Sequence, residues 1–147
     1  MSKAYVSAVA MLARREHGAK ELMQKLALKG YATDEIHEAL AECQRLDLQS
    51  DTRFAETLCR GRIRQGYGPE RIRQELKSKY IDRELIEAIL AVEDDNWLAC
   101  AMNAWRKKYK QHGDSSYLET QKQKQFLLLR GFSMHTIAMV FECITHE

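Results

Sequence analysis

Apolar side chains recur at helical spacing along most of the chain. Ile36, Ala39, Leu40 and Cys43 stand at positions i, i+3, i+4 and i+7, which places them on one face of an α-helix. The same spacing returns in a second stretch that contains Leu98, Ala101, Met102, Trp105 and Tyr109. With one proline and seven glycines, the chain has few turn-forming residues for an all-β protein. The pattern therefore predicts an all-α fold.

The apolar positions also repeat along the chain with a period of about 50 residues. Leu26, Leu76 and Leu127 occupy equivalent places in three copies. Each copy contains patterns for three short helices, and one such unit alone would not bury its apolar face. We therefore expect three tandem three-helix repeats in an elongated, curved array, right-handed or solenoid-like. The domains are expected at residues 1–49, 50–94 and 95–147, and short linkers predict that they pack against one another.

Candidate capping residues mark where several of these helices begin. The first helices of the three copies are expected at Ala4–His17, Phe54–Gln65 and Trp97–Lys110. Thr33, Asp82 and Ser133 are candidate N-caps of the third helices, since short polar side chains satisfy the free backbone amides there. Pro69 suits the first turn of a helix, where a missing amide hydrogen costs nothing.

Two glycines mark the turns between the second and third helices of their copies. Gly30 and Gly131 suit a left-handed backbone at the end of a helix. Tyr80 holds the equivalent place in the middle copy, so that turn is expected to differ or to carry strain. In the third copy a longer polar connection, His112–Ser116, precedes the second helix.

Composition and cysteine spacing favour a globular protein with reduced thiols. Hydrophobic residues make up 45% of the chain and charged residues 30%, as in globular domains. The four cysteines are far apart and form no C-x-x-C pair, which argues against a disulfide framework or a zinc site. The apolar start, Ala4–Ala13, is short and runs into charged residues, which favours an amphipathic helix over a signal peptide. No apolar run reaches the roughly 18 residues of a membrane span, so we expect a cytoplasmic protein.

The sequence contains no recognisable catalytic motif. It lacks the phosphate-binding patterns G-x-x-x-x-G-K-[ST] and G-x-G-x-x-G. Residues 66–69 include two glycines, but no strand is predicted before them, and Pro69 removes one backbone amide. The acidic run Glu93–Asp95 lacks the alternating ligands of a calcium loop. We therefore expect a protein that is not an enzyme and needs no cofactor or metal.

Charge is distributed unevenly along the chain. Residues 60–83 contain eight basic and three acidic side chains, whereas residues 84–95 contain five acidic side chains and no basic one. Three i, i+4 pairs are expected to neutralise each other within a helix; they are Glu56 with Arg60, Arg71 with Glu75, and Arg83 with Glu87. Seven cations without an acid at that spacing in the same predicted helix are our candidates for contact with an acidic partner or with DNA phosphates. They are Arg62, Arg64, Lys77, Arg106, Lys107, Lys108 and Lys110.

Three stretches of the sequence resemble one known family. The run Gly-Tyr-Gly-Pro-Glu-Arg-Ile-Arg-Gln-Glu-Leu at residues 66–76, together with Lys-Gly-Tyr at 29–31 and Arg-Gly-Phe-Ser at 130–133, resembles the RecX family of RecA regulators. The resemblance covers nearly the whole chain. It departs from the family at Tyr80, where a glycine is expected, and in the longer connection of the third copy.

The resemblance implies both a fold and a function. The fold is three tandem three-helix repeats in a curved molecule, which agrees with the observed period. The implied function is that of a monomer that lies in the groove of the RecA filament on single-stranded DNA. There it would restrain ATP hydrolysis and strand exchange and limit filament growth.

Two alternatives stay open from the residues alone. The first is a protein that binds DNA directly through helix-turn-helix-like pairs. The second is a helical adaptor without a nucleic-acid role that binds a peptide or a partner helix. The formal net charge of only +2 favours a partly basic protein-contact surface over tight general DNA binding.

Overall fold

The computed structural model describes residues 2–109 and 116–145. The regular elements in these ranges are all helical, which confirms the all-α prediction. They are α1 (Lys3–Arg14), α2 (Ala19–Leu28), α3 (Thr33–Arg45), α4 (Asp51–Arg64), α5 (Pro69–Ser78), α6 (Arg83–Val92), the short 3-10 helix η1 (Asp94–Asn96), α7 (Trp97–Lys108), α8 (Tyr117–Leu129) and α9 (Met134–Thr145). Among the described helices, none has the length and apolar character needed to cross a membrane.

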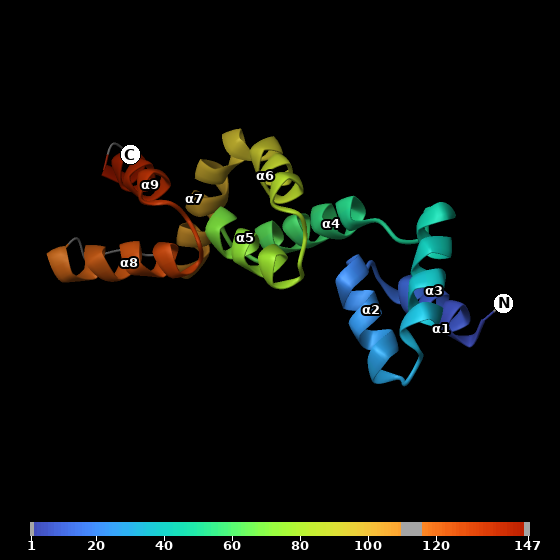
Figure 1. Cartoon of the computed structure of the whole chain (residues 1–147). Helices are drawn as coiled ribbons and strands as arrows, with labels where there is room; N and C mark the ends of the chain where they lie inside the picture. Colours follow the sequence, from blue (N-terminus) through green and yellow to red (C-terminus); the bar gives the residue numbers. More distant parts are fainter. Residues whose placement is uncertain (1, 110–115, 146–147) are drawn as a thin grey trace.

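The helices form three groups along an elongated molecule (Figure 1). Helices α1–α3 lie at the N-terminal end, α4–α6 lie in the middle, and α7–α9 lie at the opposite end (Figure 1). We call these groups domains 1, 2 and 3. Within each domain every helix packs against the other two. The predicted array of tandem three-helix repeats is therefore confirmed.

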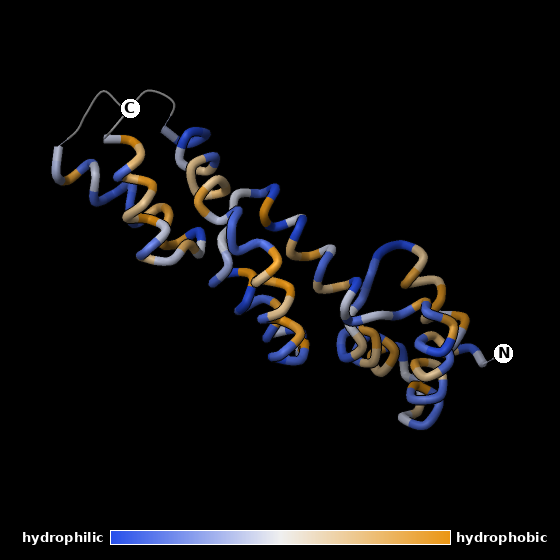
Figure 2. The backbone as a smooth tube through the Cα atoms, turned by 90° about the horizontal axis from the view of Figure 1, so that it is seen from above, coloured by the Kyte–Doolittle hydropathy of each residue, from blue (hydrophilic) through white to orange (hydrophobic). Residues whose placement is uncertain are grey.

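The apolar core is divided unequally among the domains. Domain 1 has a core of its own, formed by Ala8, Met11, Leu22, Leu26, Ile36 and Cys43. Domains 2 and 3 share one core, which extends from Phe54 on α4 to Val140 on α9. Apolar and polar segments alternate along much of the chain, as expected for helices with one buried face (Figure 2). Domains 2 and 3 are thus fused by burial of apolar surface, whereas domain 1 is joined to them by other contacts.

The first helices of the domains differ from the predicted ranges at their ends. Helix α1 ends at Arg14 and α7 ends at Lys108, both before the predicted residues. Helix α4 begins before the predicted Phe54 because Ser50 caps it, with Arg53 N donating to the Ser50 hydroxyl oxygen at 3.2 Å. Of the predicted connection His112–Ser116, only Ser116 lies within the described residues, and it caps α8.

The predicted caps of the third helices have three different outcomes. Ser133 caps α9 as predicted, and its hydroxyl oxygen accepts a hydrogen bond from Thr136 N at 3.1 Å. Asp82 occupies the N-cap position of α6, but its side chain accepts no capping hydrogen bond. The prediction for Thr33 is wrong, because Thr33 already belongs to α3 and Ala32 is the N-cap. Pro69 stands in the first turn of α5, as predicted.

The turns between second and third helices all use a left-handed residue. Gly30 has a φ of 94° and Gly131 a φ of 100°, as predicted. Tyr80 adopts the same kind of turn with a φ of 60° despite its side chain, and its ring is exposed to solvent. The turn after α4 also uses a left-handed glycine, Gly66, with a φ of 90°.

Two glycines bring the backbones of domains 2 and 3 into direct contact. Gly68 N donates to Arg130 O at 2.7 Å, and Glu70 N donates to Gly131 O at 2.9 Å. A Cβ atom on Gly68 would lie 2.6 Å from the carbonyl carbon of Gly131, and one on Gly131 would lie 2.6 Å from Arg71 N. Only glycine fits at these two positions. This glycine seam holds the start of α5 against the turn between α8 and α9.

The junction of domains 1 and 2 is built mainly from polar contacts. The buried side chain of Gln49 donates to His17 O at 3.1 Å and to Asp51 Oδ1 at 3.0 Å. The same Asp51 oxygen accepts from Ala19 N at 2.7 Å. Arg53 Nε donates to Glu16 Oε2 at 2.9 Å. These bonds tie the start of α4 to the connection between α1 and α2.

A buried carboxylate adds an ionic contact at the same junction. Glu21 on α2 binds Arg15 at 2.8 Å within domain 1 and Lys79 of domain 2 at 3.3 Å. Burial disfavours its ionised form, but the hydrogen bonds and charges of Arg15 and Lys79 outweigh burial and lower the pKa of Glu21 to about 2. Glu21 therefore stays ionised and bridges the two domains at neutral pH.

Alanine substitution at two equivalent turn glycines should separate backbone strain from loss of the seam. Gly30→Ala places a Cβ in a left-handed turn with no atom within 4 Å, so it should cost about 1–2 kcal/mol of unfolding free energy. Gly131→Ala has the same strain and also collides with Arg71, which should add about 1–3 kcal/mol. Denaturant unfolding of both variants measures the difference. Equal losses at the two positions would contradict a close-packed seam.

Acid should weaken the junction of domains 1 and 2 through Glu21. Because its pKa is lowered from the ordinary 4.5 to about 2, the stability that Glu21 contributes is complete above about pH 4.5 and is lost as the pH falls toward 2. The free energy of unfolding should therefore fall less between pH 5 and pH 2.5 in Glu21→Gln than in the unmodified chain. Glu38→Gln, at an exposed position, is the control and should follow the unmodified chain. Identical pH profiles for Glu21→Gln and the unmodified chain would refute the ionic bridge.

Candidate functional site

Three of the sequence-predicted cations meet in one cleft between domains 2 and 3. Arg64 comes from the end of α4, and Lys107 and Lys108 come from the end of α7. Arg130, at the end of α8, lines the same cleft. The cleft has a volume of ≈ 660 Å³ and is also lined by Ile63, Gln65, Gly66, Cys100, Asn103, Ala104 and Phe126. We call this site, defined by Arg64, Lys107, Lys108 and Arg130, the basic cleft.

The basic cleft has an excess of positive charge. Its lining includes four cations and no carboxylate. Within the described part of the chain, none of the four cations takes part in an ion pair. Like charges gathered at one place repel one another, so an anionic ligand that enters the cleft would relieve that repulsion. The arrangement suits phosphates or carboxylates.

Arg130 is held in place by two aromatic rings. Its guanidinium carbon lies 4.7 Å from the ring centroid of Tyr67 and 5.2 Å from that of Phe126, within the range of cation–π attraction. Its Nη1 atom also donates to Gln65 O at 3.0 Å. The sequence reasoning missed Arg130 as a site residue, although it directly precedes the left-handed Gly131. The glycine seam is what brings this end of α8 to the loop after α4.

The other predicted cations do not join the basic cleft. Arg62 was a candidate because it has no acid four residues away in its helix, but an acid of a neighbouring helix pairs with it. Its Nε and Nη2 atoms donate to the two carboxylate oxygens of Glu75 on α5, each at 2.7 Å. Lys77 lies elsewhere on α5, where its charge contributes, after those of Arg73 and Arg83, to lowering the pKa of Glu87. Arg106 does not line the cleft and has interactions of its own. Lys110 lies outside the described residues.

Two of the three predicted i, i+4 ion pairs are replaced by pairs between helices. Glu75 binds Arg62 instead of Arg71, and Glu87 binds Arg73 instead of Arg83, with Arg73 Nε donating at 2.8 Å. Arg73 also binds Glu70. The pair of Glu56 with Arg60 is likewise absent among the described residues. For Glu75 and Glu87, an arginine on a neighbouring helix competes with the arginine four residues away, and here it supplies the better bidentate geometry.

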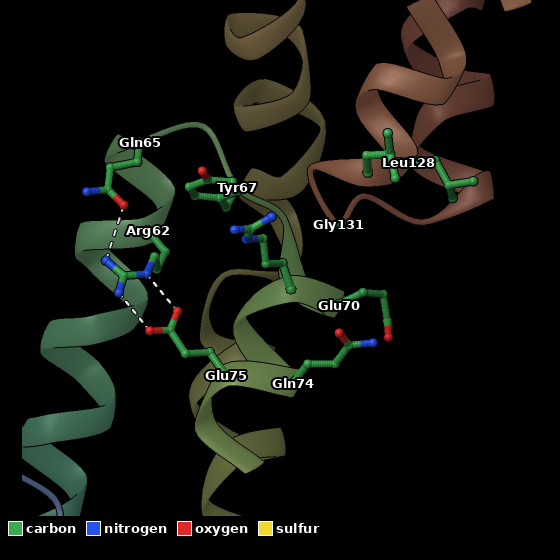
Figure 3. A pocket seen from close by; sticks show the side chains of 10 residues that line it. Arg62, Gln65, Tyr67, Glu70, Gln74, Glu75, Leu128 and Gly131 are labelled. Atoms are coloured by element: carbon green, nitrogen blue, oxygen red, sulfur yellow. Dashed lines mark hydrogen bonds and ion pairs between the residues drawn. The ribbon is translucent and has the colours of Figure 1, made fainter. Parts of the chain in front are cut away.

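A second groove lies beside the basic cleft at the same junction (Figure 3). It has a volume of ≈ 750 Å³ and is lined by Arg62, Gln65, Tyr67, Glu70, Arg71, Gln74, Glu75, Leu128, Leu129 and Gly131. We call it the leucine groove. Tyr67 lines the leucine groove and Arg130 lines the basic cleft. The stack of these two side chains therefore stands between the two sites.

The described residues were also compared with the requirements of a metal site and of a reactive thiol. They contain no group of three histidine, cysteine, aspartate or glutamate side chains that could hold a metal ion. Burial raises the pKa of the Cys59 thiol to about 11, with a further increase from the charge of Glu93. Burial likewise raises the pKa of Cys100. Both thiols are therefore weak nucleophiles at neutral pH.

Comparison with known proteins accounts for the whole array. Three family models, described as the first, second and third three-helix domains of RecX, match residues 4–43, 50–90 and 94–141. The chain is 54% identical over 142 residues to the regulatory protein RecX of Legionella pneumophila strain Corby, with 97% of this chain and 95% of that protein covered. It is 39% identical over 138 residues to the regulatory protein RecX of Vibrio campbellii, with 92% and 89% covered.

A solved structure shows the same architecture. The crystal structure of RecX from Lactobacillus salivarius superposes with a TM-score of 0.87 at 27% identity and covers 99% of this chain and 96% of that chain. The resemblance that the motifs at 66–76 and 130–133 indicated is thereby confirmed. The matches follow all three domains in order, and the chain belongs to the RecX family of regulatory proteins.

Proposed function

We propose that this protein binds the RecA filament on single-stranded DNA and inhibits its ATPase, strand exchange and growth. Membership of a family of regulatory proteins supports a role in control rather than in catalysis. We place the contact with the filament at the basic cleft, because four cations meet there without a carboxylate in the lining. We propose that the protein acts as a cytoplasmic monomer whose partner is RecA.

The elongated shape supports binding to a polymer. Three domains in a row (Figure 1) present surfaces that can meet several subunits of a filament at once. Contacts that are individually weak then add up, because each further contact forms within an already bound complex. A deep pocket is not needed for useful affinity under this arrangement.

Electrostatics supports an acidic surface or DNA phosphates as what the basic cleft meets. An exposed group of cations attracts an anionic surface over distances up to about 10 Å at 0.1 M salt. Binding through the cleft should therefore weaken as salt is added. The same four cations also favour a second candidate function, direct binding to naked DNA. That function would show the same dependence on salt in the absence of RecA.

Removing the unpaired charges of the basic cleft should weaken inhibition of RecA. We expect Arg64→Ala/Lys107→Ala/Lys108→Ala to require about tenfold more protein for half-inhibition of the single-stranded-DNA-dependent ATPase, as for a loss of about 1.4 kcal/mol in binding. Lys3→Ala/Lys20→Ala/Lys122→Ala removes the same charge from exposed positions outside the cleft and should inhibit like the unmodified chain. Circular dichroism should show equal helicity for all three proteins.

The results separate the function from its location. Full inhibition by the cleft variant would refute the basic cleft as the contact. An unchanged ATPase rate with the unmodified chain, under conditions where the filament forms, would refute the proposed function. Equal affinity for naked DNA and for the filament would favour direct DNA binding instead.

A further inference from the structure

The leucine groove exposes apolar surface that no part of the described chain covers. Leu128 and Leu129, at the end of α8, have 42% and 68% of their surfaces exposed. Both line the groove, and Leu128 lies on the opposite side from α5 (Figure 3). Two adjacent exposed leucines in a concave surface gain free energy when an apolar ligand covers them. The groove therefore has one wall suited to apolar side chains.

The wall formed by α4 and α5 contains one cation, Arg71, that has no ion pair among the described residues. The carboxylate of Glu75 is bound by Arg62 and that of Glu70 by Arg73. Arg71, by contrast, lies over the Tyr67 ring, with its guanidinium carbon 4.2 Å from the ring centroid. Glu75 lies close enough to feel its charge, but Arg71 has no ion pair among the described residues. Its donors remain available to a carboxylate of a ligand.

We propose that the leucine groove docks a short segment of the partner protein that carries apolar side chains next to a carboxylate. The apolar side chains would cover Leu128 and Leu129, and the carboxylate would bind Arg71. This inference rests on the proposed function, since the segment belongs to the RecA protein of the filament. The volume of ≈ 750 Å³ is within the range of sites that hold ligands of this size.

The chemistry of the groove argues against nucleic acid as its occupant. Glu70 and Glu75 line it together with Arg62 and Arg71, so the lining has no excess of positive charge that would attract a phosphate backbone. The basic cleft has no such carboxylate in its lining. The two sites, separated by the stack of Tyr67 and Arg130, thus differ in the ligand that each can accept. The leucine groove is the one suited to protein.

Serine substitution of the two leucines tests the groove. Leu128→Ser/Leu129→Ser should weaken binding to RecA filaments about tenfold or more, as expected for anchor residues of a binding site. Arg71→Ala should weaken it as well. Tyr117→Ser/Leu118→Ser is the matched control, because these residues lie on the same helix, are 75% and 74% exposed, and are outside the groove. Binding is measured by anisotropy of fluorescently labelled protein titrated with RecA assembled on single-stranded DNA, and circular dichroism monitors folding.

The outcomes test separately whether the groove binds RecA, whether the proposed function is right, and whether nucleic acid occupies the groove instead. Loss of affinity in the groove variant alone, with unchanged affinity for a single-stranded oligonucleotide without RecA, supports the inference. Unchanged affinity of the groove variant for the filament, while the unmodified chain still inhibits the ATPase, overturns the groove and leaves the proposed function intact. A matching loss of affinity for the naked oligonucleotide would identify nucleic acid as the occupant and overturn the inference. If the unmodified chain fails to bind the filament, the proposed function and the inference both fall.

Discussion

The contact of Gly68 with Gly131 is the constraint on which both candidate sites depend. Two hydrogen bonds cross this seam, and a Cβ atom on either glycine would collide with the opposite backbone. The turn after α4 and the end of α8 are therefore held side by side. That proximity places Arg130 over Tyr67, next to Arg64, and it places Leu128 opposite α5. If the turn after α4 and the end of α8 were further apart, neither the basic cleft nor the leucine groove would form.

The two domain junctions are held by different physical means. Domains 2 and 3 share one apolar core, so their relative position is fixed by close packing as well as by the seam. Domain 1 keeps a separate core and meets domain 2 through directional bonds of Gln49, Asp51, Arg53 and Glu21. Its attachment depends on charged side chains in their ionised states, whereas the junction that carries the candidate sites does not.

The sequence predicted the fold more completely than the site. Periodicity requires only local spacing, which is why the three repeats and the left-handed turns at Gly30 and Gly131 were predictable. The site depends on which helices become neighbours. Arg62 and Glu75 are far enough apart in the sequence that no rule based on i, i+4 spacing would pair them. Arg130 lines the basic cleft only because the glycine seam brings the end of α8 to the loop after α4. The early start of α4 could have been found, since Ser50 is a good capping residue before Asp51.

Helical geometry explains why one short stretch of arginines serves two chemically different surfaces. Successive residues of an α-helix are rotated by about 100°, so residues two apart point about 200° apart. At the end of α4, Arg62 therefore faces α5, where Glu75 binds it, while Arg64 faces the cleft bordered by α7. The acids of α5 and α6 bind Arg62 and Arg73, and the end of α7 brings lysines instead. A formal net charge of only +2 thus coexists with a strongly basic cleft, because the acids pair with cations elsewhere and none of them lines the cleft.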